Sequence, residues 1–175
     1  MDNNSQDTAV NIEADPLLLR RMNNRFLVAS VLGIKLPLAF FAGLRVESCT
    51  TERCAVSLPY GWRSQNPFRS IYFGAQCMAA ELSTGALGFL VTSSVPKPDT
   101  VAMLVTGMSA TFTAKATSRT TFVCSQGIQV HSAIEETMST GKGVRVRMNS
   151  IGHMENGEEV ARFEFEWSFR KRKRK

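Results

Sequence analysis

The chain has 175 residues, enough for one domain with a sizeable hydrophobic core, and its apolar (43%) and charged (21%) fractions are those of an ordinary globular protein. The net charge of +6 is local, because the last six residues, Arg170 to Lys175, are all basic; without them the 21 Lys and Arg fall to 15, equal to the 15 Asp and Glu. The domain itself therefore shows no basic nucleic-acid footprint, and no specific nucleic-acid partner is expected.

The first elements are a polar terminus and a helix. Residues 1–14 lack periodicity and are predicted to be a disordered N-terminus. A helix is expected to follow, with Asp15 as its N-cap, Pro16 at the first helical position and Gly33 as its stop.

An apolar stretch, Phe26 to Leu44, overlaps this helix and is about as long as a membrane span. It carries Lys35 and Pro37 near its centre, where a charge is costly in a bilayer and proline breaks the helix. We therefore expect a buried amphipathic helix followed by an irregular apolar segment. Interfacial membrane contact is the alternative.

The middle of the chain predicts a hairpin and then a central helix. Leu44 to Pro59 alternates around the turn-like "TTER", which is typical of a β-hairpin. Ser70 to about Leu90 is the longest helical pattern, and its many glycines and alanines keep the helix narrow enough for a sheet to wrap closely around it.

The second half is rich in strands. "TVAMLVTGMSATFTAKAT" and "RTTFVCSQ" predict two of them, and a short helix is expected in "GIQVHSAIEETMSTG". Two strictly alternating strands follow, joined at Asn156-Gly157, a strong hairpin signal. Strands grouped around one helix, without βαβ alternation, indicate an α+β fold with an antiparallel sheet. The expected domain covers residues 15–170, and the basic tail covers residues 171–175.

The four cysteines, Cys49, Cys54, Cys77 and Cys124, include no Cys-x-x-Cys pair and no His at metal spacing, so no metal is expected. Cys49 and Cys54 can face each other across the hairpin, with a disulfide as the less favoured alternative. No signal peptide is visible, and reduced thiols in a cytoplasmic location are expected.

This order of elements resembles the hotdog fold, in which a long curved antiparallel sheet wraps a central helix. More narrowly, residues 35–170 resemble the phenylacetyl-CoA thioesterase type and its relatives of unknown function. The central segment of that family reads approximately N-x-x-G-x-x-H-G-G-A-x-x-x-x-A-D/E. The stretch "NPFRSIYFGAQCMAAE" keeps Asn66, Gly74 and Glu81 at matching positions.

The same segment departs from the family at three positions. Arg69 stands where the family often has Gly, Tyr72 where it has His, and Phe73 where it has the first Gly. A tyrosine hydroxyl can donate a hydrogen bond but cannot shuttle protons near neutral pH as histidine does, so packing is the favoured role for Tyr72.

The resemblance implies a catalytic role for three residues. Glu81 would be the general base or the nucleophile, acting across a dimer interface on a carbonyl held by the partner's central helix. Gly74 would let that carbonyl approach the free N–H groups at the helix start. Asn66 would position the thioester or water. The alternative for Glu81 is a structural acid that pairs with an Arg or faces solvent. The alternative for Asn66 is that Asn66-Pro67 only forms a turn.

Further residues are candidates for substrate binding. Thr84 is expected to line an acyl pocket. Lys115 and Arg119 are expected to hold the phosphates of coenzyme A, or else to be solvent-exposed residues at the end of a strand. The full set of these candidates is Tyr72, Phe73, Thr84, Lys115 and Arg119.

The expected function is therefore that of a cytoplasmic acyl-CoA thioesterase, a homodimer or homotetramer that needs no cofactor beyond the coenzyme A of its substrate. One alternative is a non-catalytic hotdog protein that binds acyl-CoA or a fatty acid. Another is a membrane- or nucleic-acid-associated module that acts through the basic tail. In that alternative the apolar stretch Phe26 to Leu44 is a further candidate for weak membrane contact.

Overall fold

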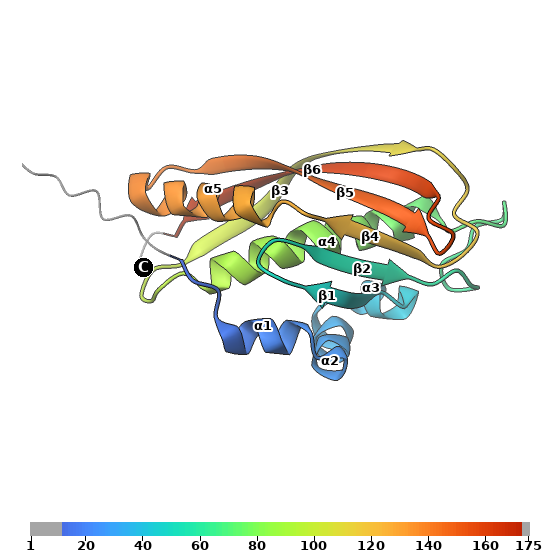
Figure 1. Ribbon diagram of the computed structural model, residues 1–175, viewed down its shortest axis with the longest axis horizontal. Helices are drawn as coiled ribbons and strands as arrows, with labels where there is room; N and C mark the ends of the chain where they lie inside the picture. Colours follow the sequence, from blue (N-terminus) through green and yellow to red (C-terminus); the bar gives the residue numbers. More distant parts are fainter. Residues whose placement is uncertain (1–11, 173–175) are drawn as a thin grey trace, which may run out of the picture.

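The structure is a computed structural model that describes residues 12–172. Within these residues six strands form one antiparallel sheet in the order β1-β2-β4-β5-β6-β3, which curves around the long helix α4 (Figure 1). This confirms the predicted α+β class with a central helix. The strands are β1 Arg45–Cys49, β2 Cys54–Leu58, β3 Val101–Phe112, β4 Thr120–Cys124, β5 Val144–Met154 and β6 Glu159–Lys171. The helices are α1 Pro16–Met22, α2 Arg25–Lys35, α3 Pro37–Ala42, α4 Phe73–Ser93 and α5 Gly127–Thr140.

The inner face of β6 supplies much of the core. Phe163, Phe165, Trp167 and Phe169 alternate along the strand and are all buried. Phe163 stacks on Phe165 with ring centroids 6.1 Å apart. Burying each such side chain stabilises the fold by about 1.5–3 kcal/mol.

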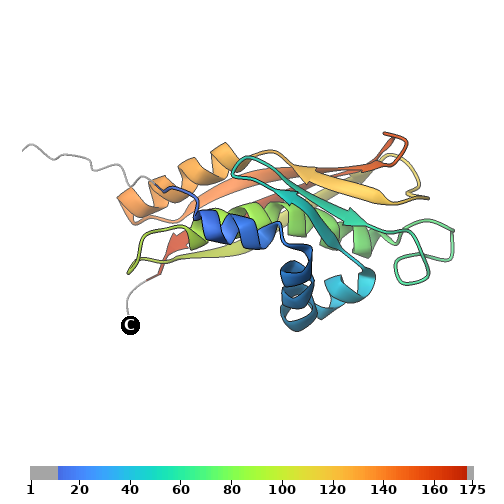
Figure 2. The ribbon, with the colours of Figure 1, turned by 60° about the horizontal axis from the view of Figure 1, so that its bottom comes forward.

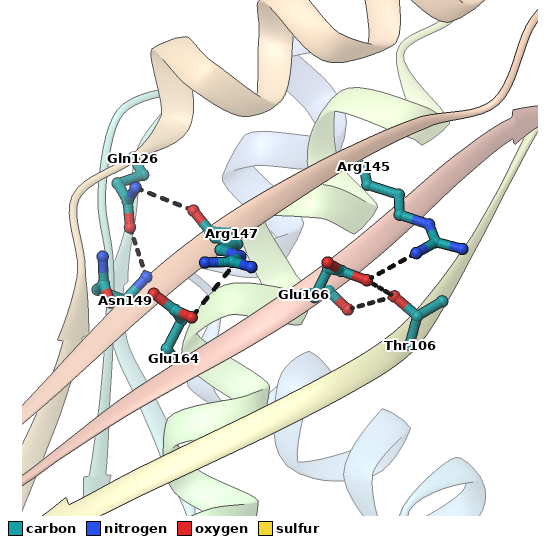
Figure 3. A network of polar contacts seen from close by, with 7 residues as sticks. All are labelled: Thr106, Gln126, Arg145, Arg147, Asn149, Glu164 and Glu166. Atoms are coloured by element: carbon teal, nitrogen blue, oxygen red, sulfur yellow. Dashed lines mark hydrogen bonds and ion pairs between the residues drawn. The ribbon is translucent and has the colours of Figure 1, made fainter.

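The outer face of the sheet is charged and internally paired (Figure 3). The Glu166 carboxylate accepts a 2.6 Å hydrogen bond from the Thr106 hydroxyl and lies 3.3 Å from the Arg145 guanidinium. The Thr106 hydroxyl, together with nearby Arg145 and Arg147, lowers the pKa of Glu166. Glu164 pairs with Arg147 at 3.8 Å. Exposed pairs of this kind add little stability, and the face they form suits contact with water.

The predicted hairpin is present as β1 and β2. Cys49 lies directly opposite Cys54 in the strand pairing, as the sequence suggested, and both are free thiols. The pairing continues from β2 to β4, where Cys54 lies opposite Cys124.

The N-terminal helix is divided, contrary to the single helix expected. Asp15 caps α1 as predicted, accepting a hydrogen bond from the Leu17 N–H at 2.8 Å. The Asn24 side chain then accepts from the N–H groups of Phe26 and Leu27, which starts α2 as a separate helix. The expected stop at Gly33 is wrong, because this residue lies inside α2.

The expectation of a buried amphipathic helix is also wrong. In α2 only Leu32 is buried, while Phe26 is 78% exposed and Ile34 is 76% exposed. The irregular segment expected after it is the helix α3, which ends at Gly43 in a left-handed conformation with φ of 86°. No helix within residues 12–172 is long and apolar enough to cross a membrane.

The two ends of the predicted domain are partly described. Residues 1–11 of the N-terminus predicted to be disordered lie outside the described residues. Ile12, which belongs to the same predicted segment, is buried and contacts His131. At the other end β6 includes Lys171, whose ammonium lies 3.0 Å from the Asp99 carboxylate. Residues 173–175 of the predicted basic tail lie outside the described residues.

Candidate functional site

Glu81 lies in the middle of the one stripe of α4 that the sheet leaves partly open. The stripe follows helical spacing, and its members are Gly74, Cys77, Met78, Glu81, Leu82, Gly85 and Phe89. β3 borders it on one side, where the Cys77 and Met108 sulfurs are 3.2 Å apart. α3 borders it on the other side. The acid is therefore half-buried between two apolar borders.

A cavity of about 260 Å³ separates α3 from the Glu81 side of α4. Its lining is apolar except at two positions, Glu81 in its wall and Lys35; the other lining residues are Leu36, Pro37, Leu38, Ala39, Met78 and Leu82. Burial raises the pKa of Glu81 above its ordinary value of 4.5. Within residues 12–172 the Glu81 carboxylate takes part in no hydrogen bond or ion pair. A carboxylate with raised proton affinity and no partner is suited to accept a proton.

The start of α4 offers free backbone donors. The Tyr72 carbonyl accepts from the N–H groups of Ala75 and Gln76 at 3.0 and 3.2 Å. The N–H groups of Phe73 and Gly74 have no acceptor among the described residues, and the helix dipole places partial positive charge there. Such donors can stabilise an oxyanion.

The Tyr72 ring packs against this helix start. A Cβ added at Gly74 would lie 2.6 Å from the Tyr72 ring, so the close approach of the ring requires glycine at this position. Tyr72 is half-exposed and its ring is tilted on Phe73, with centroids 4.8 Å apart. Tyr72 and Phe73 therefore flank the donors, in agreement with the packing role expected for Tyr72.

Asn66 is held within its own loop. Its Oδ1 accepts from the N–H groups of Phe68 and Ser70, and its Nδ2 donates to the Ser70 hydroxyl at 3.1 Å. Arg69, in the same loop, adopts a left-handed conformation with φ of 58°. Both ends of the Asn66 amide are thus engaged in the turn, which favours the turn alternative over a direct role in the site.

Thr84, expected to line an acyl pocket, is not among the residues that line the cavity beside Glu81. It is fully buried on the side of α4 that faces β6, where its hydroxyl donates to the Glu81 carbonyl at 2.9 Å and accepts from the Trp167 indole N–H at 3.0 Å. The hydroxyl links the helix turn that carries Glu81 to β6.

Thr84→Val is expected to lower the free energy of unfolding by about 1–3 kcal/mol, because it leaves the buried Trp167 N–H without an acceptor. Urea denaturation measures the change, and Thr84→Ser, which keeps the hydroxyl, is the control. Equal stability of the Val variant and the wild type would show that the hydrogen bond contributes nothing.

The two candidate phosphate ligands lie in the loop between β3 and β4. Lys115 is exposed and has no ion pair within the described residues. Arg119 lies near two carboxylates, 3.6 Å from Glu47 and 3.8 Å from Glu155. Arg119 is therefore less available to an anionic ligand than Lys115.

Two features of the site were missed in the sequence. One is the wall contributed by α3, which belongs to the apolar stretch Phe26 to Leu44 and is predicted to be irregular rather than helical. Gln76 is buried in the first turns of α4; its Nε2 donates to the Ile71 carbonyl at 3.2 Å, and its Oε1 has no hydrogen-bond partner within residues 12–172. Its only sequence signal was a polar residue inside an apolar helix.

A second cavity, of about 300 Å³, lies near the other end of α4, between Ile12 and the start of α5. Its one imidazole, that of His131, already contacts the Ile12 carbonyl and lies 3.4 Å from the Glu135 carboxylate. This cavity contains none of the predicted site residues.

Residues 24–169 match the sequence profile of a protein family described as a domain of unknown function, DUF4442. The chain belongs to this family. No curated protein sequence matches the chain significantly.

Solved structures show the fold. A protein of unknown function from Pseudomonas aeruginosa, named a probable thioesterase, has a TM-score of 0.72 and 21% identity, with 93% of this chain and 100% of that chain covered. A putative thioesterase from Shewanella oneidensis has a TM-score of 0.65 and 14% identity, covering 88% and 98%. A thioesterase from Haemophilus influenzae has a TM-score of 0.61 and 12% identity, covering 83% and 90%. The predicted hotdog fold is confirmed, and so is the resemblance to a family of unknown function; the likeness to thioesterases holds at the level of the fold.

Proposed function

We propose that this DUF4442 chain hydrolyses an acyl-CoA thioester, with Glu81 as general base or nucleophile and the start of α4 as the oxyanion site. The observation that carries the proposal is the Glu81 carboxylate, half-buried in the wall of an apolar cavity without a partner among the described residues. A fatty-acyl or aryl-acyl group suits that cavity, and the thioesterase names of the structural neighbours add support at the level of the fold.

The proposed reaction balances with water as the only co-substrate. As a base, the Glu81 carboxylate takes a proton from water, and the oxygen adds to the thioester carbonyl. The N–H groups of Phe73 and Gly74 stabilise the oxyanion, each by about 3 kcal/mol if well aimed. The C–S bond then breaks, and the thiolate leaves with the proton from Glu81. As a nucleophile, the Glu81 carboxylate would attack the thioester carbonyl, and the C–S bond would break to release the thiolate and leave an acyl anhydride. Water would then cleave the anhydride, which frees the acid, restores the Glu81 carboxylate and supplies the proton that the thiolate takes up.

Two chains are proposed to build each site. Gly74 and Glu81 are seven residues apart, about 10 Å along the helix axis. At this distance the helix start and the Glu81 carboxylate of one chain cannot both act on the same thioester carbonyl. β3 is a bare edge of 12 residues. Beside it Met108 and Phe112 are 53% and 46% exposed, next to the open stripe of α4. A homodimer formed along β3 would cover these surfaces and enclose Glu81.

Coenzyme A binding is proposed for the exposed side of this site, with Lys115 as a cation for its phosphates. Tyr72 and Phe73 would contact the part of the substrate nearest the thioester. The cytoplasmic location stays a prediction from the cysteines.

Hydrolysis is expected to fall by about tenfold per pH unit below the raised pKa of Glu81, because only the carboxylate accepts a proton. Thiol release from short, long and aromatic acyl-CoA, measured as kcat/KM against pH, tests this. The acid limb should lie above the ordinary carboxyl range. A rate that does not change with pH through this range would contradict the assignment.

A second candidate function is non-catalytic binding of acyl-CoA or a fatty acid. The Tyr72 side chain favours this function. It packs against Gly74 and stands at the position where the phenylacetyl-CoA thioesterase type has a histidine. Saturable acyl-CoA binding without turnover of any thioester would identify this function.

A further inference from the structure

Helices α2 and α3 stand off from the body of the molecule beside β1 (Figure 2). Their exposed apolar side chains, together with Trp62 from the loop after β2, make up an apolar surface. We call it the α2–α3 face. Its most exposed members are Phe26, Val31, Ile34, Leu38, Phe41 and Trp62, with exposed fractions of 78%, 57%, 76%, 75%, 55% and 75%. Phe41 and Trp62 meet edge to face, with ring centroids 5.9 Å apart. The solvent side of a surface helix is normally polar, so this face is built to be covered.

The surroundings of the face are cationic. Residues 16–46 contain five basic residues and no acidic one. The five are Arg20, Arg21, Arg25, Lys35 and Arg45, and all are exposed and outside any ion pair among the described residues. Asp15 and Glu47 are the acidic residues that bound this segment. An apolar helical face carried by a segment rich in unpaired basic residues is the pattern of a protein that lies on an anionic lipid surface.

The same charges argue against a second copy as the occupant. In a two-fold interface the face would meet itself, which would bring two sets of five unpaired cations together. The exposed apolar row along β3, by contrast, has no such concentration of charge beside it. On the outer face of the sheet, Arg145 pairs with Glu166 and Arg147 pairs with Glu164, so these charges are already partnered (Figure 3).

We propose that the α2–α3 face docks on the surface of an anionic lipid bilayer. Leu38 belongs both to this face and to the lining of the Glu81 cavity, and Lys35 lines the same cavity, so docking brings the cavity to the membrane. An acyl chain would then enter from the lipid side rather than from water. This last step rests on the proposed function, whereas the docking itself does not.

Vesicle co-sedimentation of the full chain tests the docking, with phosphatidylcholine vesicles and with vesicles that also contain phosphatidylglycerol. Wild type should bind the anionic vesicles much more strongly. The double variant Ile34→Glu, Leu38→Glu should lose at least about tenfold of this binding. Arg21→Gln and Arg25→Gln should each lose about fivefold. The matched control is Ile128→Glu, which alters an equally exposed apolar residue on α5, and it should bind as wild type does.

Four results would overturn the proposal, and one of them, given below, concerns the basic tail. The other three are no binding of wild type to anionic vesicles, unchanged binding by the double variant, or a fall in oligomeric mass of the double variant in light scattering. The last would make the face a contact between chains. A variant with Lys173, Arg174 and Lys175 changed to Gln distinguishes binding by the tail from binding by the α2–α3 face. If this variant alone lost all vesicle binding, that result would also overturn the proposal. The assay does not measure hydrolysis, so its failure leaves the proposed thioesterase untouched, and an inactive chain that binds vesicles leaves the docking intact.

Discussion

Glu81→Gln is expected to remove thioester hydrolysis and, in the same variant, to stabilise the fold. The rate should fall by a factor on the order of 10² or more, because the amide neither takes a proton from water nor attacks the carbonyl. The free energy of unfolding near neutral pH should rise by about 0.5–2 kcal/mol, as when a residue kept for function at the expense of stability is replaced.

The pH dependence of stability gives this prediction a sign. Burial raises the pKa of Glu81, so the folded chain holds this proton more tightly than the unfolded chain does. As the pH rises from the ordinary pKa of a glutamate through the raised pKa of Glu81, ionisation of this carboxyl therefore lowers the free energy of unfolding. The Gln variant lacks this loss, and its advantage should be absent at acid pH and fully developed above that window.

Glu136→Gln is the matched control, since Glu136 is an exposed helical glutamate on α5. It should change neither the rate nor the stability. Urea denaturation at several pH values and thiol release measure the two properties. A Glu81→Gln variant that loses stability at neutral pH would show that the carboxylate has a stabilising partner.

Met108→Lys is expected to convert the proposed dimer to monomers and to lower hydrolysis more than tenfold. Met108 lies near the middle of β3 and is 53% exposed beside α4. In a dimer along this edge, the two lysines would be desolvated close to each other, and like charges in an interface cost several kcal/mol. Light scattering and thiol release at equal chain concentration measure the two effects.

Ile128→Lys, which places the same charge on an equally accessible apolar site of α5, is the control and should remain dimeric and active. Full activity of a monomeric Met108→Lys chain would contradict a site built from two chains. A dimeric variant with full activity would show that β3 is not the interface.

The sheet and the central helix were predictable because their patterns are local. Alternation along β6 places Phe163 and Phe165 on one face whatever the partner strands are. The Asn156-Gly157 turn was equally readable, since Gly157 adopts the left-handed φ of 84° that such a turn requires. Glu81 was identified through the family resemblance of its segment rather than through its spacing alone.

The N-terminal helices and several site residues were not predictable for a physical reason. Whether an apolar helix is buried depends on what packs on it, and the sequence of α2 does not contain that information. The Thr84–Trp167 hydrogen bond joins residues 83 positions apart, so the local sequence around Thr84 does not reveal it. The split at Asn24 depended on a side-chain cap that competes with helix continuation.

The most direct test of the central claim is thiol release from short, long and aromatic acyl-CoA by wild type and Glu81→Gln side by side, with binding of the same thioesters measured in parallel. Wild type is predicted to turn over at least one class of thioester, and the variant to bind it with its fold intact but to hydrolyse it about 10² or more times slower. No turnover by wild type, with saturable binding by both proteins, would contradict the claim and leave Glu81 a structural residue of an acyl-CoA-binding protein.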